Sequence, residues 1–63
     1  MNPDQTSIQS AYEDALGKLY AVLFDAYVAA GGDSTQEQQA DAHFTVGLTF
    51  AKKSRDRALA LVA

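Results

Sequence analysis

The chain has 63 residues, enough for one domain and close to the size at which a single hydrophobic core is only marginally sufficient. It contains no cysteine and a single histidine, which excludes disulfide bonds, thiolate metal sites and a zinc centre. The net charge of −3 disfavours nucleic acid as a partner, because binding to a phosphate backbone depends on Lys and Arg. With no disulfide or metal to stabilise so small a domain, we expect it to oligomerise.

An amphipathic helix is predicted over about residues 7–30. Thr6 or Ser7 can cap its N-terminus, after a short segment that contains Pro3. Apolar side chains recur at alternating spacings of four and three residues, which is the spacing of a heptad seam. The seam residues are Ile8, Tyr12, Ala15, Leu19, Val22 and Ala26.

The strongest break in the sequence is the segment from Gly31 to Thr35. Gly31 and Gly32 can supply the left-handed residue that closes a helix C-terminus. Ser34, with Glu37 three residues later, has the pattern of a capping box that opens the next helix. We therefore expect the chain to turn back on itself here.

A second helix is predicted over about residues 35–62, with a seam of its own. The seam residues are Ala40, Phe44, Gly47, Ala51, Ser54, Ala58 and Leu61. When the chain folds at the glycines, the two seams oppose each other, with Leu19 facing Gly47 and Tyr12 facing Ser54. Large residues then meet small ones, as close packing requires. The predicted fold class is all-α: one antiparallel helical hairpin that forms a single domain over residues 1–63.

A hairpin alone cannot bury all of the apolar residues, because many lie on the flank beside the seam. In the first helix these are Leu16, Tyr20, Leu23 and Tyr27, with Phe24 further round. In the second helix they are Leu48, Phe50, Leu59 and Val62. The simplest partner for this apolar flank is a second copy of the chain, which predicts a homodimeric four-helix bundle.

The charges favour one orientation of the two hairpins in such a dimer. The loop end carries Asp25, Asp33, Glu37 and Asp41, and no basic residue lies near them in the sequence. The open end holds the basic residues of the second helix. Antiparallel docking brings unlike ends together, and parallel docking stacks acid on acid. Exposed ion pairs contribute only about 0 to 1 kcal/mol each, so they bias the orientation.

No group of residues with the chemistry of a catalytic, cofactor or metal site is evident. His43 has no second ligand at a suitable spacing. Glu13 and Glu37 fall on polar positions, which does not fit the inward-facing carboxylates of a di-metal bundle. Ser34, Ser54 and Thr45 have no base within evident reach. We expect a protein that is not an enzyme and binds no cofactor.

Two groups of side chains are candidates for binding a partner. Tyr20, Phe24 and Tyr27 form an aromatic flank, and Phe24 projects furthest from the seam, as an interface hot spot would. A basic cluster in the second helix, which could bind anions, consists of Lys52, Lys53, Arg55 and Arg57. Asp56 and the acidic start of the first helix can compensate this cluster, so a solvated helix face is the simpler interpretation.

A short antiparallel hairpin with small residues along its seam resembles the Rop type of plasmid RNA-binding bundle. The stretch from Glu37 to His43 has a similar character. The resemblance implies an RNA-binding face with basic residues on the first helix, where this chain has only Lys18. The alternative that it leaves open is an RNA-binding regulator that uses the basic half of the second helix.

The sequence therefore predicts a non-enzymatic protein–protein interaction module, a small accessory or regulatory subunit that acts as a homodimer and binds another protein. The N-terminus lacks the basic and apolar regions of a signal peptide. The longest apolar run, Leu19 to Ala30, is too short to span a bilayer and contains Asp25. We expect a soluble, cytoplasmic protein.

Overall fold

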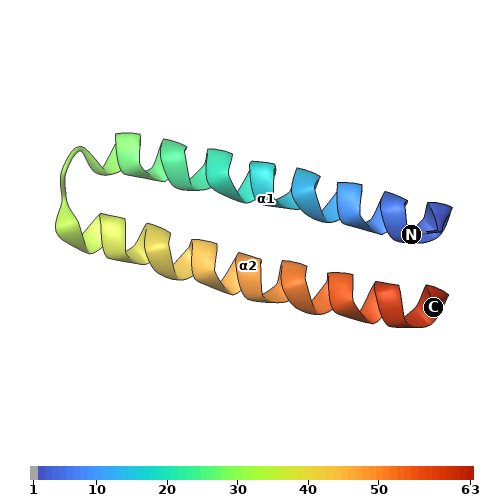
Figure 1. The fold of residues 1–63 in the computed structure, drawn as a ribbon. Helices are drawn as coiled ribbons and strands as arrows, with labels where there is room; N and C mark the ends of the chain where they lie inside the picture. Colours follow the sequence, from blue (N-terminus) through green and yellow to red (C-terminus); the bar gives the residue numbers. More distant parts are fainter. Residues whose placement is uncertain (1) are drawn as a thin grey trace.

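The computed structural model describes residues 2–63 as two long helices that run antiparallel (Figure 1). Helix α1 spans Pro3–Ala30, helix α2 spans Ser34–Val62, and residues 31–33 join them. The start of α1 and the end of α2 lie at the same end of the molecule, which we call the open end, opposite the turn. The described residues include no strand, so the predicted all-α hairpin is confirmed. Within residues 2–63, neither helix has an apolar stretch long enough to cross a membrane.

Helix α1 begins about one turn earlier than the sequence indicated, because Asn2 is its N-cap. The Asn2 side chain accepts a hydrogen bond from the Gln5 backbone N–H at 2.8 Å, and the Asn2 N–H donates to Gln5 Oε1 at 3.0 Å. Pro3 occupies the first helical position, where no intrahelical N–H is needed. The prediction that Thr6 or Ser7 caps this helix is wrong. The Thr6 hydroxyl instead donates to the Asn2 carbonyl oxygen at 3.2 Å.

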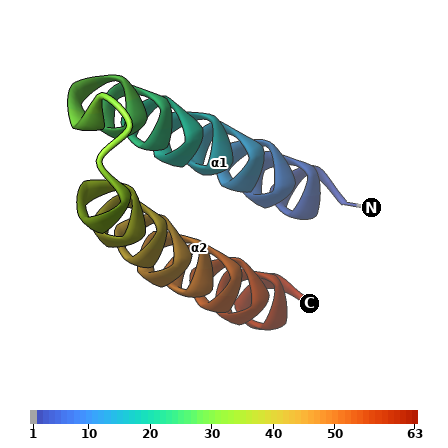
Figure 2. The same ribbon diagram turned by 90° about the vertical axis from the view of Figure 1, so that its left-hand side faces the viewer.

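Two glycines close α1 and form the turn, which Figure 2 brings toward the viewer. Gly31 has φ 57° and Gly32 has φ 90°, conformations that residues with a Cβ rarely adopt. Asp33, not Ser34, is the N-cap of α2, and its side chain accepts from the Gln36 N–H at 2.9 Å. The predicted capping box on Ser34 is therefore wrong by one residue, because the carboxylate of Asp33 takes that position.

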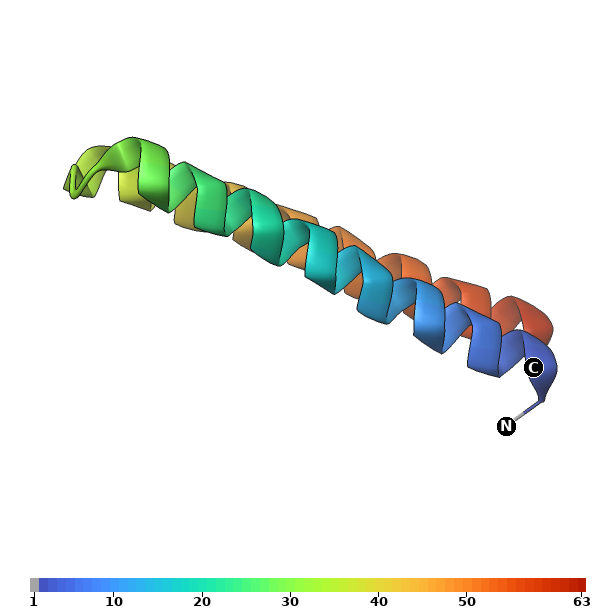
Figure 3. The same cartoon turned by 90° about the horizontal axis from the view of Figure 1, so that it is seen from above.

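The register of the hairpin is confirmed where the closest approach was predicted, at Leu19 and Gly47. A Cβ placed on Gly47 would overlap Leu19 Cδ2 and would lie 3.5 Å from its Cδ1. Any side chain at this position would force Leu19 to move from its observed place. The two helices run next to each other in Figure 1, and α1 overlies most of α2 when the hairpin is seen from above in Figure 3.

The predicted seam is wrong at three positions, Val22, Ser54 and Leu61, which are exposed. Their neighbours in the sequence are half-buried instead, namely Leu23, Arg55 and Val62. A strict alternation of four and three residues averages 3.5 per turn, and it drifts by about 20° per heptad around a straight helix of 3.6 residues per turn. The positions that meet the other helix therefore shift by one residue along the series.

The hairpin has little interior of its own. The only buried apolar residues among those described are Ala30 and Ala40, both in the half of the hairpin near the turn, and no large side chain is fully buried. The Cα atoms extend over 45 × 15 × 10 Å, and the accessible surface is 4569 Å². A compact monomer of 6.7 kDa would expose about 3,900 Å². Large apolar side chains are left in solvent: Tyr20, Val22, Phe24, Tyr27, Val28, Val46, Phe50 and Leu61.

Candidate interaction surfaces

The two helices leave two broad faces of the hairpin uncovered. The aromatic face carries Tyr20, Phe24 and Tyr27 of α1 and Asp41 of α2. The groove face carries a different stripe of α1 and the facing stripe of α2. The groove face residues are Ala11, Ala15, Val22, Ala29, Gln36, His43, Phe50 and Ser54. The two α1 stripes lie on opposite flanks of the helix, because successive residues turn by about 100°.

Tyr20 and Phe24 form a stacked aromatic pair on the surface of α1. Their ring centroids are 6.5 Å apart and the ring planes make an angle of 23°. The two residues are 64% and 57% exposed, so most of this apolar area remains in contact with water. The spacing of four residues brings both rings onto one side of the helix. That these residues bind a partner remains a prediction.

Tyr27, the third aromatic residue predicted to bind a partner, also has a role within the hairpin. Its hydroxyl donates a hydrogen bond to Asp41 Oδ1 and so links α1 to α2 near the turn. This hydrogen bond raises the pKa of Tyr27, and partial desolvation and the negative charges of Asp41 and Glu37 raise it further. Tyr27 is 38% exposed, the least of the three aromatic residues. Sequence reasoning missed this contact, although both residues lie seven positions from Ser34 and could have been paired by counting outward from the turn.

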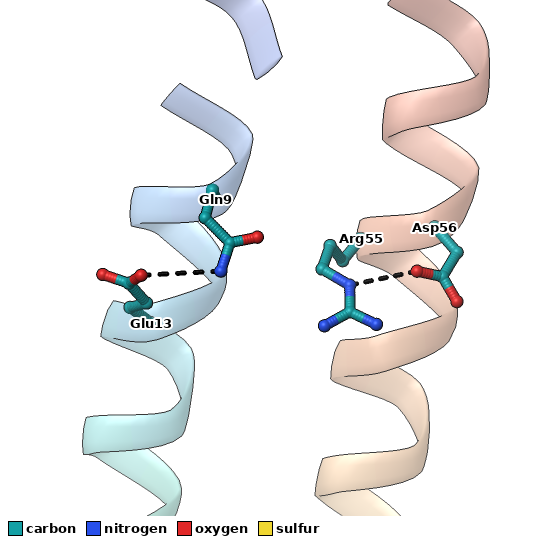
Figure 4. Close-up of polar contacts among 4 residues, drawn as sticks. All are labelled: Gln9, Glu13, Arg55 and Asp56. Carbon is teal, nitrogen blue, oxygen red and sulfur yellow. Dashed lines mark hydrogen bonds and ion pairs between the residues drawn. The ribbon is translucent and has the colours of Figure 1, made fainter. Parts of the chain in front are cut away.

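The basic cluster is divided by the structure. Arg55 is half-buried, and its guanidinium carbon lies 4.3 Å from the centroid of the Tyr12 ring. Its Nε donates to Asp56 Oδ1 at 3.0 Å, the one ion pair among residues 2–63 (Figure 4). The other three members, Lys52, Lys53 and Arg57, are exposed.

The Arg55 contact revises the predicted pairing at the open end, where Tyr12 was expected to face Ser54. The arginine lies over the Tyr12 ring instead, in the geometry of a cation–π interaction. Opposite it on α1, Gln9 Nε2 donates to Glu13 Oε1 at 3.5 Å within the helix (Figure 4). Arg55 thus contributes to the packing of the hairpin and is less available for a phosphate group than the other three basic residues.

Two shallow hollows lie along the groove face and meet at Leu19, which lines both. The hollow toward the open end has a floor of small side chains, including Ala15, Gly47 and Ala51. The hollow toward the turn has Gln36, Gln39 and His43 along its α2 side. The only side chain with a fixed charge in either lining belongs to Arg55. Together the hollows form a mostly uncharged groove between the helices.

Phe50 lies on the groove face and lines the hollow toward the open end. The sequence predicted that Phe50 lies with Leu48 and Leu59 in the apolar area outside the seam. A separation of two residues turns the helix by about 200°, so Phe50 and Leu48 cannot share a flank. The apolar residues outside the seam are therefore divided between two faces of the hairpin.

Within the described part of the chain, no three His, Cys, Asp or Glu side chains lie close enough together to hold a metal ion. Comparisons with protein families, with curated proteins and with solved structures find no match to this chain. The likeness to Rop-type bundles therefore remains one of outline.

Proposed function

We propose that this chain is a non-enzymatic protein-interaction module that acts as a homodimer and binds another protein through the aromatic face. The observation that carries the proposal is the exposed, stacked pair of Tyr20 and Phe24. Aromatic residues are enriched among the side chains that dominate binding energies at protein interfaces. A cytoplasmic location is part of the same proposal.

Two features make the aromatic pair suited to binding. Both rings project from one side of a single helix with their centroids 6.5 Å apart, so the backbone already presents them together before a partner binds. The hydrogen bond from Tyr27 to Asp41 holds the adjacent edge of the face in place. The surrounding half of the hairpin is acidic and contains no Lys or Arg. The chemistry favours a partner with an apolar pocket and a basic rim.

The dimer is supported by the amount of surface that the isolated hairpin exposes. Its accessible area exceeds that of a compact monomer of the same mass by about 650 Å². A typical stable interface covers about 800 Å² on each partner. Burial against a second copy would bring the exposed area per chain to the level expected of a globular protein.

The alternative function, an RNA-binding regulator, is favoured by one observation. Lys52, Lys53 and Arg57 are exposed along the second half of α2, where they could contact phosphate groups. The contacts of Arg55 with Tyr12 and Asp56 count against it, because they leave three of the four basic residues for this role.

Capture of partners from a lysate of the source cells, followed by titration of the captured partner, tests the proposal. Phe24→Ala should weaken binding at least about 30-fold, the effect of losing a hot spot, and should leave helicity and dimer mass unchanged. Val46→Ala is the matched control, because Val46 is similarly exposed but lies on α2. If Phe24→Ala binds normally, and replacing Lys52, Lys53 and Arg57 with Gln abolishes capture, the result contradicts the aromatic face and favours the RNA-binding alternative.

A further inference from the structure

We propose that the second copy docks antiparallel on the groove face, which leaves the aromatic face free for a different protein. This inference rests on the homodimer of the proposed function and assigns the interface within it. The sequence predicted the dimer contact only for the apolar area outside the seam, without assigning it to one face of the hairpin.

A twofold interface requires one surface that carries both the hollows and the side chains that fill them. Both hollows lie on this face, and neither is lined by Tyr20, Phe24 or Tyr27. The same face carries Val22 and Phe50, which are exposed in the single hairpin. Each copy can therefore provide both the hollows and the large apolar side chains that fill them.

The register of the hairpin places these features in matching positions. Because Leu19 lies against Gly47, the residues of α1 that lie level with Phe50 are close to Leu16 and Gly17. A twofold axis at this level, perpendicular to the helices, brings the two Phe50 side chains together. It also places Val22 of each copy against Ala11 of the other, since both are equally far from the axis. A large residue then meets a small one on both sides of the interface.

The distribution of charge selects the antiparallel orientation. The loop half of the hairpin, residues 20–44, has four carboxylates and no Lys or Arg. The remainder has five basic and four acidic residues. Antiparallel docking sets the acidic half of each copy against the mixed half of the other, and parallel docking sets the two acidic halves together. The same axis places Lys18 of each copy beside Asp14 of the other, at the edge of the groove face.

Variants that introduce a negative charge at positions of matched exposure test the face. Val22 and Phe24 are 51% and 57% exposed, so a glutamate at either position is accommodated in the single hairpin. Val22→Glu should raise the dimer dissociation constant by at least about 100-fold, because it buries an unpaired carboxylate in the interface. Phe24→Glu should leave the dissociation constant within a few-fold of the parent value. Sedimentation at a series of concentrations measures both, and circular dichroism checks that each variant is helical.

Single cysteine variants give a second readout that does not depend on destabilising the dimer, since the chain has no cysteine of its own. Phe50→Cys should form a disulfide-linked dimer under mild oxidation, and Phe24→Cys should not. Spin labels on Thr35→Cys should lie about 45 Å apart in the antiparallel dimer, given 1.5 Å of rise per residue. In a parallel dimer the same labels would be within about 20 Å, because packed helix axes are 8–10 Å apart.

The outcomes separate this inference from the proposed function. A dimer that Phe24→Glu dissociates, with cross-linking through Phe24→Cys, overturns the groove assignment and keeps the homodimer. A label distance below about 20 Å overturns the antiparallel orientation. A parent chain that stays monomeric at high micromolar concentration overturns both the homodimer and its interface. In that case the binding test with Phe24→Ala still decides whether the aromatic face binds another protein.

Discussion

Leu19 of α1 packs directly over Gly47 of α2, so closely that a side chain on the glycine would occupy the space of the leucine Cδ2. Glycine in the middle of a helix costs about 1 kcal/mol relative to alanine. Its presence at this position is explained by the close approach of the two helices.

Gly47→Leu is expected to lower the stability of the protein by about 1 to 3 kcal/mol through overpacking, in spite of the better helix propensity of leucine. The double variant Leu19→Ala/Gly47→Leu exchanges the large and small partners and should recover part of the loss. Thermal unfolding followed by circular dichroism measures all three chains. A Gly47→Leu variant that melts above the parent would show that Gly47 does not face Leu19.

Gly17 is the matched control, because it also lies within a helix but no atom lies within 4 Å of a Cβ placed on it. Gly17→Ala should therefore gain the full helix-propensity difference, about 1 kcal/mol, and raise the melting temperature by several degrees. A loss of stability at this position would indicate that the outer surface of α1 is covered in the assembled protein.

The N-cap of α2 gives a test that separates two adjacent residues. Asp33→Ala removes the acceptor for the Gln36 N–H and should destabilise the protein by about 1 kcal/mol. Ser34→Ala should have almost no effect, because Ser34 is the first residue of the helix and not its cap. Urea denaturation of both variants measures the difference. Equal effects, or a larger effect of Ser34→Ala, would contradict the observed cap.

Much of the fold follows from the sequence, and the deviations have physical causes. The register could be predicted because Leu19 and Gly47 differ so much in size that only one alignment brings large residues against small ones. The first residues of the helices could not be predicted, because several residues near each start have similar capping preferences. Asn2 competes with Thr6 and Ser7 for the N-cap of α1, and Asp33 competes with Ser34 for that of α2.

The candidate sites were less predictable than the fold. That Tyr20 and Phe24 share one side of α1 follows from their spacing, but their stacking depends on side-chain rotamers. Arg55 was assigned to an anion-binding cluster because its charge is evident in the sequence. Its contact with Tyr12 arises because the long Arg55 side chain lies across the seam. A pattern of apolar residues gives no information about the direction that a charged side chain takes. The division of the apolar surface into two faces could have been predicted, because a separation of two residues turns a helix by about 200° and puts Leu48 and Phe50 on different sides.

The hydrogen bond from Tyr27 to Asp41 predicts a loss of stability at alkaline pH. The pKa of Tyr27 is raised above its ordinary value of 10.0, so the folded chain holds this proton more tightly than the unfolded chain. The stabilising contribution is therefore complete below pH 10 and is lost as the pH rises through the raised pKa.

Asp41→Asn should return the pKa of Tyr27 toward the ordinary range. Absorbance titration at the tyrosinate band measures this shift, with Tyr27→Phe to identify the signal. Three tyrosines that titrate together in the parent chain would contradict the contact.

The division of the basic cluster leads to the last prediction. Arg55→Gln removes the cation from the Tyr12 ring and should destabilise the hairpin by about 0.5 to 1 kcal/mol. Lys52→Gln, Lys53→Gln and Arg57→Gln should each leave the melting temperature unchanged, because these side chains are exposed. Retention on a heparin column provides the complementary measurement, since binding to phosphate or sulfate groups weakens steeply with added salt. If the three exposed residues do not bind polyanions, the parent chain should elute at low salt. If Arg55 stabilises the fold, Arg55→Gln should lower the melting temperature and leave the elution unchanged. Strong, salt-dependent retention that the three exposed substitutions abolish would instead favour the RNA-binding alternative.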